Sequence, residues 1–327
     1  MSTANHLLLA GDVGGTKVLL GLFDTTAPRP RALETRSFPT LDYGDLCDMV
    51  DVFLGGCGVT GPIEAACIGV AGPVIDGTAE VTNVPWTVRA SELARRFGIP
   101  RVVLLNDLEA MAYSVPVLAD EELAVLQEGT ARSDGNMALI AAGTGLGEAL
   151  LCRVQGRLVP SASEAGHADF AARTEREIKL LRELTARYGR ADVEHVISGR
   201  GLFNIFPITH EGRACTGRVD LSQADAPAAI TGAALAKACS GCEQALELFI
   251  EAYGAEAGNL ALRAVATSGV YIGGGIAAKI LPALTDGRFL HAFRAKPPLE
   301  ALVAAVPVKV ILNPNAALVG AAAYLVQ

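Results

Sequence analysis

The sequence predicts an α/β fold built in two halves. At 327 residues the chain is long for one domain. Apolar runs typical of buried strands alternate with amphipathic stretches typical of helices along its whole length. Each half also opens on one plan, an apolar strand, a turn containing Gly and Thr, and a second apolar strand. These openings, residues 7–24 and 137–154, share little sequence, so we expect a repeat of architecture.

The first half is expected to alternate strands with short helices. The residues Leu46, Met49, Val50 and Phe53 recur at helical spacing, which predicts a helix over residues 43–54. The other expected helices are 90–97 and 108–115. The expected strands are residues 6–10, 18–23, 33–38, 65–71 and 102–105, with a further strand and its exit loop within residues 80–87.

A polar, acidic passage at residues 116–135 precedes the second half. The expected strands there are 137–142, 148–154, 269–272 and 308–312. The expected helices are 174–188, 202–206, 230–267, 276–284 and 316–326, the third with interruptions at Gly241, Gly254 and Gly258.

Composition excludes several classes of protein. Hydrophobic residues make up 51% of the chain and charged residues 19%, which favours a large buried core over disorder. A net charge of −8 argues against nucleic acid or an anionic membrane as the main partner. The N-terminus lacks the basic region of a signal peptide, and no apolar run is long enough for a membrane span. We therefore expect a cytoplasmic protein.

Seven cysteines are scattered through apolar surroundings, which is typical of reduced core thiols. Cys239 and Cys242 form a CxxC pair, a spacing also found in redox sites and in half of a zinc site. No second pair and no His lies nearby at metal-binding spacing. The pattern therefore favours structural thiols.

Three glycine-rich turns follow predicted strands, at residues 11–16, 143–147 and 273–275. In open α/β structures ligands bind outside the carboxyl ends of strands, and glycine lets a phosphate approach the backbone. Asp12 ends the first strand, where a hydrated Mg²⁺ would find an oxygen ligand. None of the turns has the P-loop pattern. Each could also be an ordinary tight turn, but together they favour a nucleotide site built from both halves.

Three further groups of residues are candidates for acid–base or binding roles. Asn106 and Asp107 follow a buried strand, so Asp107 could act as a general base or as the N-cap of the next helix. Glu164 and His167 share a small-residue loop suited to metal binding or to gripping sugar hydroxyls, with little support for zinc. Glu194 is either a third functional carboxylate or a solvated helix residue.

Assembled in order, these motifs resemble the bacterial glucokinase family of the sugar kinase and actin-like ATPase superfamily. The resemblance runs nearly end to end. Its motifs are Gly11-Asp12-Val13-Gly14-Gly15-Thr16, Thr82-Asn83 with Trp86, Asn106-Asp107, Gly143-Thr144-Gly145-Leu146-Gly147, Glu164-Ala165-Gly166-His167-Ala168-Asp169-Phe170, Ser198-Gly199-Arg200-Gly201-Leu202 and Ile272-Gly273-Gly274-Gly275-Ile276.

The resemblance implies a two-lobed actin-like ATPase (ribonuclease H-like) architecture with a nucleotide and sugar cleft between the lobes. The small lobe would comprise residues 1–117 and 313–327, and the large lobe residues 118–312. It also implies ATP-dependent phosphorylation of glucose at its 6-hydroxyl, with Mg²⁺ as cofactor, and a homodimer.

The same resemblance assigns roles to individual residues. Asp107 would be the general base, and Asn106, Glu164, His167 and Glu194 would hold the sugar with it. Asp12 would act on Mg²⁺ through water. The residues expected to bind ATP are Gly11, Asp12, Val13, Gly14, Gly15, Thr16, Gly143, Thr144, Gly145, Gly273, Gly274 and Gly275.

The sequence departs from the family pattern at three places. Lys17 stands where many members have Asn, and it could touch phosphate or be solvated. Ala165 replaces a commoner Gly, which should alter loop freedom more than chemistry. The cysteine-rich zinc motif of the related ROK sugar kinases is absent, which predicts no structural zinc. Two other functions stay open, a kinase of another hexose or N-acetylhexosamine and a non-catalytic sugar-sensing regulator.

Overall fold

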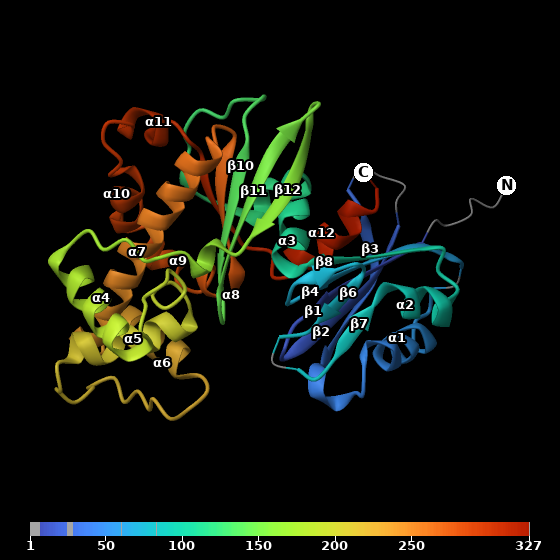
Figure 1. The fold of residues 1–327 in the computed structure, drawn as a ribbon, viewed down its shortest axis with the longest axis horizontal. Coiled ribbons are helices and arrows are strands. Elements are labelled where there is room, and N and C mark those ends of the chain that lie inside the picture. The colour runs from blue at the N-terminus through green and yellow to red at the C-terminus, as the bar shows by residue number, and fades with distance from the viewer. Residues whose placement is uncertain (1–6, 25–28, 60, 83, 327) are drawn as a thin grey trace. The chain divides into compact units, whose positions relative to one another are not determined.

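The computed structural model describes residues 7–24, 29–59, 61–82 and 84–326 (Figure 1). Contacts between residues divide the chain into two compact units. Unit 1 comprises Met1–Ala119 and Asn315–Gln327, and unit 2 comprises Asp120–Pro314. Within the described residues, no helix combines the length and the apolar character needed to cross a bilayer.

A five-stranded sheet forms the centre of unit 1, in the order β3-β2-β1-β4-β8. β3, β2 and β1 run antiparallel, whereas β1, β4 and β8 run parallel. Parallel strands end at one edge of a sheet, so the residues after β1, β4 and β8 are brought together. The strands are β1 (Leu7–Val13), β2 (Lys17–Asp24), β3 (Arg31–Pro39), β4 (Ile63–Val70) and β8 (Arg101–Asn106).

Helices cover both faces of this sheet. Leu9 and Val13 of β1 share a core with α1 and α2, whereas Leu8 and Ala10 of the same strand share another with α3 and α12. The alternation follows the two-residue period of a strand. The helices are α1 (Leu46–Gly55), α2 (Ala90–Phe97), α3 (Asp107–Ser114) and α12 (Ala316–Tyr324), with 3₁₀ turns at Thr40–Asp42 and Val115–Val117.

The strand expected at the start of residues 80–87 is shorter than predicted, since it ends at Glu80. A small sheet of β5 (Val74–Ile75), β6 (Thr78–Glu80) and β7 (Thr87–Arg89) occupies this region. A hydrogen bond of 3.0 Å from Val81 N to Trp86 O links the chain just after β6 to the chain just before β7. The buried Trp86 anchors this part of the chain in the core of unit 1.

Unit 2 repeats the plan of unit 1 around a six-stranded sheet. Its order is β12-β11-β10-β13-β14-β9, with β12, β11 and β10 antiparallel and β10, β13 and β14 parallel. The expected repeat of architecture is therefore confirmed at the level of strand order and direction. The strands are β9 (Leu123–Gln127), β10 (Met137–Ala142), β11 (Leu146–Val154), β12 (Arg157–Ser163), β13 (Gly269–Gly273) and β14 (Val308–Ile311).

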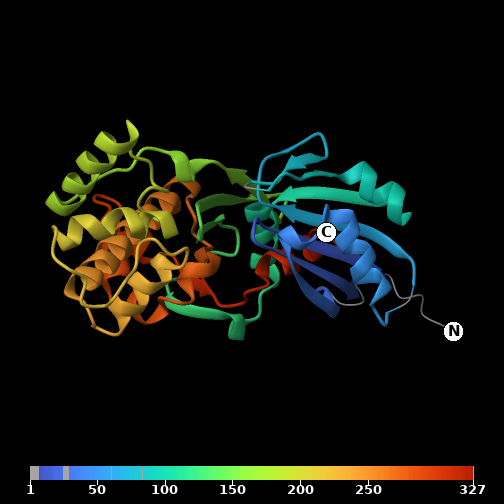
Figure 2. The same cartoon turned by 90° about the horizontal axis from the view of Figure 1, so that it is seen from below.

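The helices of unit 2 pack with its sheet into one large core. Figures 1 and 2 show α4, α5 and α6, coloured yellow-green to gold, lying together at one end of the unit. The helices are α4 (Glu175–Tyr188), α5 (Gly199–His210), α6 (Ala226–Leu235), α7 (Ser240–Ala264), α8 (Gly274–Ala277), α9 (Leu281–Leu284), α10 (Arg288–Arg294) and α11 (Glu300–Ala304), with 3₁₀ turns at Asp120–Glu122 and Ala165–His167.

Two glycines that were expected to interrupt a helix lie inside α7 instead. A Cβ atom on Gly254 would lie 2.2 Å from the carbonyl oxygen of Phe289, and one on Gly258 would lie 2.5 Å from that of Phe293. Both carbonyls belong to α10. The glycines therefore allow α10 to pack closely against an unbroken α7.

Candidate functional site

The first glycine turn joins β1 to β2 at the end of the unit 1 sheet. Gly14 N donates to Lys17 O (3.0 Å), which closes the turn. The buried Thr40 braces it from outside, because its hydroxyl donates to Gly14 O (2.8 Å) and its N–H donates to Thr16 O (3.0 Å). The Thr16 side chain is exposed. These hydrogen bonds fix the conformation of the turn and leave its backbone accessible, as a phosphate-binding loop requires.

Asn106 and Asp107 lie at the end of β8, where α3 begins. Asn106 is the N-cap, since its Oδ1 accepts hydrogen bonds from Leu108 N (3.0 Å) and Glu109 N (3.4 Å). The alternative that Asp107 is the cap is therefore wrong. Asp107 is the first residue of α3, and its Oδ1 also accepts from Leu108 N (2.9 Å).

Asp12 lies on β1 and Asp107 at the start of α3, near enough for the charge of Asp107 to act on Asp12. β4 lies between β1 and β8, and Gly69 pairs with Asp12. A Cβ atom on Gly69 would lie 2.9 Å from Ala110 Cβ, so glycine at this position lets α3 pack closely against β4. Burial, and secondarily the negative charge of Asp107, raise the pKa of Asp12 to about 6, while Lys17 acts in the opposite direction. The paired carboxylates form an acidic centre that a cation would stabilise.

The second glycine turn, in unit 2, is built against Glu194. Glu194 Oε2 accepts a hydrogen bond from Leu146 N (2.9 Å). A Cβ atom on Gly145 would lie 2.5 Å from the same oxygen, so only glycine leaves room for this carboxylate. Gly143 N donates to Gly145 O, and Gly143 O accepts from Gly199 N, both at 2.8 Å. Glu194 is half-buried in a turn, which corrects the alternative of a solvated helix residue.

The loop that carries Glu164 and His167 packs against the same turn. Glu194 N donates to Gly166 O (2.8 Å), and a Cβ atom on Gly166 would lie 2.2 Å from Leu146 O. His167 N donates to Glu164 O (3.0 Å), which folds the loop into its 3₁₀ turn. The side chains of Glu164 and His167 are exposed. Unit 2 therefore brings these three predicted residues into one cluster.

Asp192 is a member of this cluster that sequence reasoning missed. Its Oδ2 lies 3.4 Å from His167 Nδ1, and its Oδ1 lies 2.9 Å from His195 Nδ1. Asp192 is buried, and Tyr188 stacks on the His195 ring at 4.4 Å between centroids. Asp192 thus connects His167 to His195, which is distant from it in sequence. The Asp192-x-x-His195 spacing marks a turn, but only the fold reveals contact with His167.

The third glycine turn follows β13 beside β10. Gly274 has a φ of +85°, and a Cβ atom on it would lie 2.3 Å from Ala142 O. Both features require glycine. Gly273 is buried and Gly275 is exposed. Because β10 ends at Ala142, this turn lies next to the start of the 143–147 turn, so the two predicted nucleotide loops of unit 2 are neighbours.

The predicted residues thus form one group in each unit. The unit 1 group contains the 11–16 turn, Asn106 and Asp107. The unit 2 group contains the two glycine turns with Glu164, His167 and Glu194. Asn83, one of the motif residues, lies outside the described part of the chain.

The CxxC pair has potential metal ligands close to it in space that its sequence surroundings do not reveal. The structure brings His210 and Cys215 to Cys239 and Cys242, with one ligand atom from each residue within 4.8 Å of all the others. Sequence reasoning missed this group because His210 and Cys215 lie far from the CxxC pair along the chain. The fold of α5 back onto α7 joins them.

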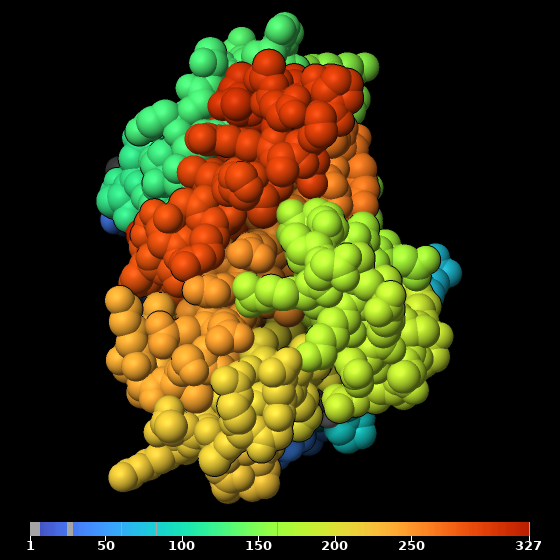
Figure 3. Space-filling view, turned by 90° about the vertical axis from the view of Figure 1, so that its left-hand side faces the viewer, coloured from blue at the N-terminus to red at the C-terminus, as the bar shows by residue number. Residues whose placement is uncertain are grey.

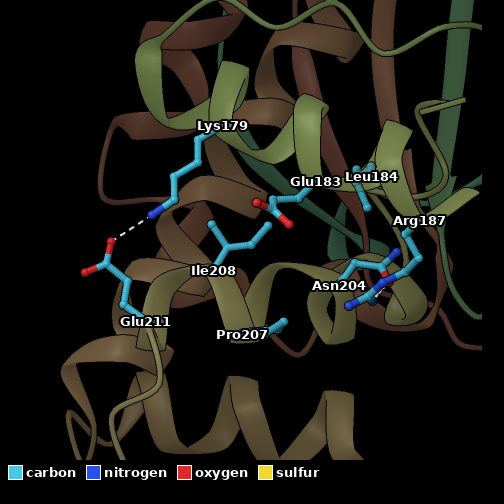
Figure 4. A pocket seen from close by; sticks show the side chains of 8 residues that line it. All are labelled: Lys179, Glu183, Leu184, Arg187, Asn204, Pro207, Ile208 and Glu211. Carbon is cyan, nitrogen blue, oxygen red and sulfur yellow. Dashed lines mark hydrogen bonds and ion pairs between the residues drawn. The ribbon is translucent and has the colours of Figure 1, made fainter. Parts of the chain in front are cut away.

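A pocket between α4 and α5 shares no residue with the predicted site. It has a volume of about 330 Å³, and Figure 4 shows Lys179 and Glu211 meeting at one end of it, with Nζ and Oε1 2.8 Å apart. Arg187 and Asn204 lie near its other end (Figure 4). The pocket is an open depression of the surface, and its lining residues include no glycine turn and no paired carboxylates.

Comparison with known proteins gives a consistent result. A family model described as Glucokinase matches residues 9–327. A glucokinase of Nostoc sp. is 39% identical over 97% of this chain and 98% of its own length. Among solved structures, a glucokinase from an Antarctic psychrotroph is 30% identical, with a TM-score of 0.86 over 98% of both chains. A ROK family glucokinase from Streptomyces griseus, solved with glucose and AMPPNP, has the same fold, with 22% identity and a TM-score of 0.65 over 97% of this chain and 98% of its own.

Proposed function

The chain belongs to the glucokinase family, and we propose that it transfers the γ-phosphoryl group of ATP to the 6-hydroxyl of D-glucose with Asp107 as the general base. The family match covers nearly the whole chain and supports the activity of an ATP-dependent hexose kinase. The base assignment rests on one observation, the carboxylate pair of Asp12 and Asp107 at the end of the parallel strands of unit 1.

In the proposed reaction each carboxylate has its own task. Asp107 accepts the proton of the 6-hydroxyl while that oxygen bonds to the γ-phosphorus, and the bond to the bridging oxygen of ADP breaks. Burial raises the pKa of Asp12 to about 6, so its ionised form is destabilised in the folded protein and a nearby cation would relieve this cost. The pair therefore fits Mg²⁺, which Asp12 would hold through water. When bound, Mg²⁺ neutralises charge on the β- and γ-phosphates.

We assign glucose recognition to Asn106, Asp107, Glu164, His167 and Glu194. Carboxylate, amide and imidazole groups hydrogen-bond to sugar hydroxyls. Such a site discriminates against analogues that lack a hydroxyl, because its own polar groups would be left without partners. The hydrogen bonds that fix Glu194 to Leu146 N and to Gly166 O support a preorganised role for this carboxylate.

The proposal requires residues of both units to act on one ATP and one glucose molecule. This is the two-lobed actin-like arrangement expected from the sequence, with lobes of residues 1–117 plus 313–327 and of residues 118–312. The three glycine turns would then hold ATP. Lobe closure around the substrates would exclude water, which competes with the sugar for the phosphoryl group.

Two wider features complete the proposal. The use of ATP favours the cytoplasm as the location, and family membership favours a homodimer. The mass of the purified protein in solution, measured by light scattering, tests the dimer directly.

An ATP-coupled assay against a panel of hexoses and N-acetylhexosamines tests the activity. We expect glucose to have the highest kcat/KM and glucose 6-phosphate to be the product. A higher kcat/KM for another sugar, with glucose phosphorylated poorly, would replace the glucokinase assignment by a kinase of that sugar. Sugar binding without phosphorylation of any member of the panel would instead indicate a regulator.

A further inference from the structure

Four potential metal ligands meet where the end of α5, the loop after it and the start of α7 converge. His210 is the last residue of α5, and Cys215 lies in the loop that leads to α6. Cys239 is the N-cap of α7, and Cys242 belongs to its first turn. No role in phosphoryl transfer uses these residues.

The distances between the ligand atoms match those of a tetrahedral zinc site. His210 Nε2 lies 3.3 Å from Cys239 Sγ and 4.0 Å from Cys242 Sγ, and the Sγ atoms of Cys215 and Cys242 are 3.7 Å apart. With Zn–S bonds of about 2.3 Å and Zn–N bonds of about 2.0–2.1 Å, tetrahedral angles place neighbouring ligand atoms about 3.5–3.8 Å apart. The four side chains therefore already surround a volume of the right size for the ion.

The His210 ring is oriented as a metal ligand. Its Nδ1 lies 2.8 Å from Phe206 O, and since a carbonyl only accepts hydrogen bonds, Nδ1 carries the proton. The lone pair of Nε2 therefore points towards the sulfur atoms. A hydrogen bond from the far ring nitrogen to a backbone carbonyl is a common second contact of zinc-binding histidines. Phe206 also stacks on the ring, with centroids 3.7 Å apart.

The backbone around the ligands is shaped for close approach. A Cβ atom on Gly241, between the two cysteines of the CxxC pair, would lie 2.6 Å from the His210 ring. On the loop, a Cβ atom on Gly217 would lie 2.6 Å from Ala233 Cβ and 3.3 Å from Cys239 Cβ. Two glycines thus allow the loop and the histidine to reach the start of α7.

The position of two of the cysteines offsets part of the cost of burying thiolates. His210, Cys239 and Cys242 are buried, and Cys215 is half-buried. Cys239 and Cys242 lie at the N-terminus of α7, where the helix dipole stabilises negative charge. Three thiolates and a neutral imidazole form a donor set that selects zinc over hard cations.

The loop between α5 and α6 supplies a structural reason for a metal. Residues 211–225 contain no helix or strand, which is unusual for a connection of this length in a compact unit. The loop runs along the lower edge of unit 2 in Figure 1, and the yellow part of the chain that includes it lies at the surface in Figure 3. A bound ion would fasten this irregular loop to the helix α7.

We propose that His210, Cys215, Cys239 and Cys242 form a structural zinc site that holds the α5–α6 loop against the N-terminus of α7. The protein supplies all four ligands, which is the arrangement of a structural site and leaves no open position for a substrate. The ion would contribute to the folding of unit 2 and take no part in the transfer of the phosphoryl group.

Metal analysis of the purified full-length protein tests the proposal. We expect about one zinc per chain, and a loss of most of it in Cys215→Ser and in His210→Ala. Cys152→Ser is the matched control, since Cys152 is a half-buried cysteine of unit 2 outside the cluster. The Cys152→Ser variant should bind as much zinc as the wild type. We also expect the unfolding temperature to fall by about 5 °C or more on removal of zinc by a chelator, with recovery when zinc is returned.

Cobalt titration keeps the test decisive if a variant fails to fold. Chelated wild-type protein should bind one Co²⁺ and develop the visible absorption of a tetrahedral thiolate site, and zinc should abolish this absorption. Protein that contains no zinc and yields no such spectrum overturns the proposal. A disulfide between Cys215 and Cys242, detected by mass spectrometry in place of the metal, overturns it equally.

Discussion

The carboxylate of Asp192 reaches the imidazole of His167, with Oδ2 3.4 Å from Nδ1. Asp192 is buried, whereas the His167 side chain is about half exposed, so a fixed group orients an accessible one. A hydrogen bond at Nδ1 places the proton there and leaves Nε2 as the acceptor. Asp192 would therefore fix the orientation of the His167 ring and make its Nε2 the acceptor for a sugar hydroxyl.

Asp192→Asn should raise the KM for glucose about tenfold and change kcat less. The amide keeps an oxygen for the N–H of His195, which donates to Asp192 Oδ1 at 2.8 Å, but it removes the charge that orients His167. Steady-state kinetics with varied glucose measure the effect. Asp169→Asn is the control, because Asp169 is exposed and pairs only at the surface with Arg190. An unchanged KM for glucose in Asp192→Asn would show that His167 needs no orienting partner.

Gly145→Ala should weaken glucose binding through Glu194. The added Cβ would lie 2.5 Å from Glu194 Oε2 and displace the carboxylate from its hydrogen bond to Leu146 N. We expect the KM for glucose to rise about tenfold or more. Gly143→Ala provides the comparison in the same turn, because no atom lies within 4 Å of its added Cβ. If both variants raise the KM for glucose equally, the effect is not transmitted by Glu194.

Asp12→Asn should stabilise the ligand-free protein while it removes activity. The pKa of Asp12 is raised to about 6 from 3.8, so between these values the folded state holds the proton more tightly than the unfolded state. Stability therefore falls as the pH rises through this window, and the full penalty, up to about 3 kcal/mol, is present above pH 6.

Urea unfolding at pH 5 and pH 7.5 measures this difference. The Asp12→Asn variant should exceed the wild type in stability at pH 7.5 and by less at pH 5, with kcat reduced at both values. A variant less stable than the wild type at pH 7.5 would mean that Lys17 or another neighbour already compensates the charge.

Much of the fold was predictable because its signals are local. The helix expected at residues 90–97 matches α2, since Gly98 takes the left-handed conformation that ends a helix. The strand–turn–strand opening of each unit, β1 with β2 and β10 with β11, was also predictable from the shared opening plan. The strands β9 and β12 were missed because their pairing with β14 and β11 is not encoded in their own residues.

The candidate site was predictable as a set of motifs, but its supporting contacts were not. Glycine turns and strand-end carboxylates have short sequence patterns. The contact of Asp192 with His167, the interaction of Asp12 with Asp107 and the meeting of His210 with Cys239 depend on segments that are distant in sequence. Such contacts are fixed by packing, which a single sequence does not display.

The kinetics of Asp107→Ala test the central claim most directly. With saturating ATP, Mg²⁺ and glucose, kcat should fall by about 10²–10⁴-fold, because general base catalysis typically supplies that factor. The circular dichroism spectrum should be retained, and glucose should still bind through the four other residues assigned to it. Glu109→Gln, which alters a carboxylate in the same helical turn, should keep most of the activity. A near-normal kcat in Asp107→Ala, with glucose 6-phosphate still formed, would contradict the assignment of Asp107 as the base.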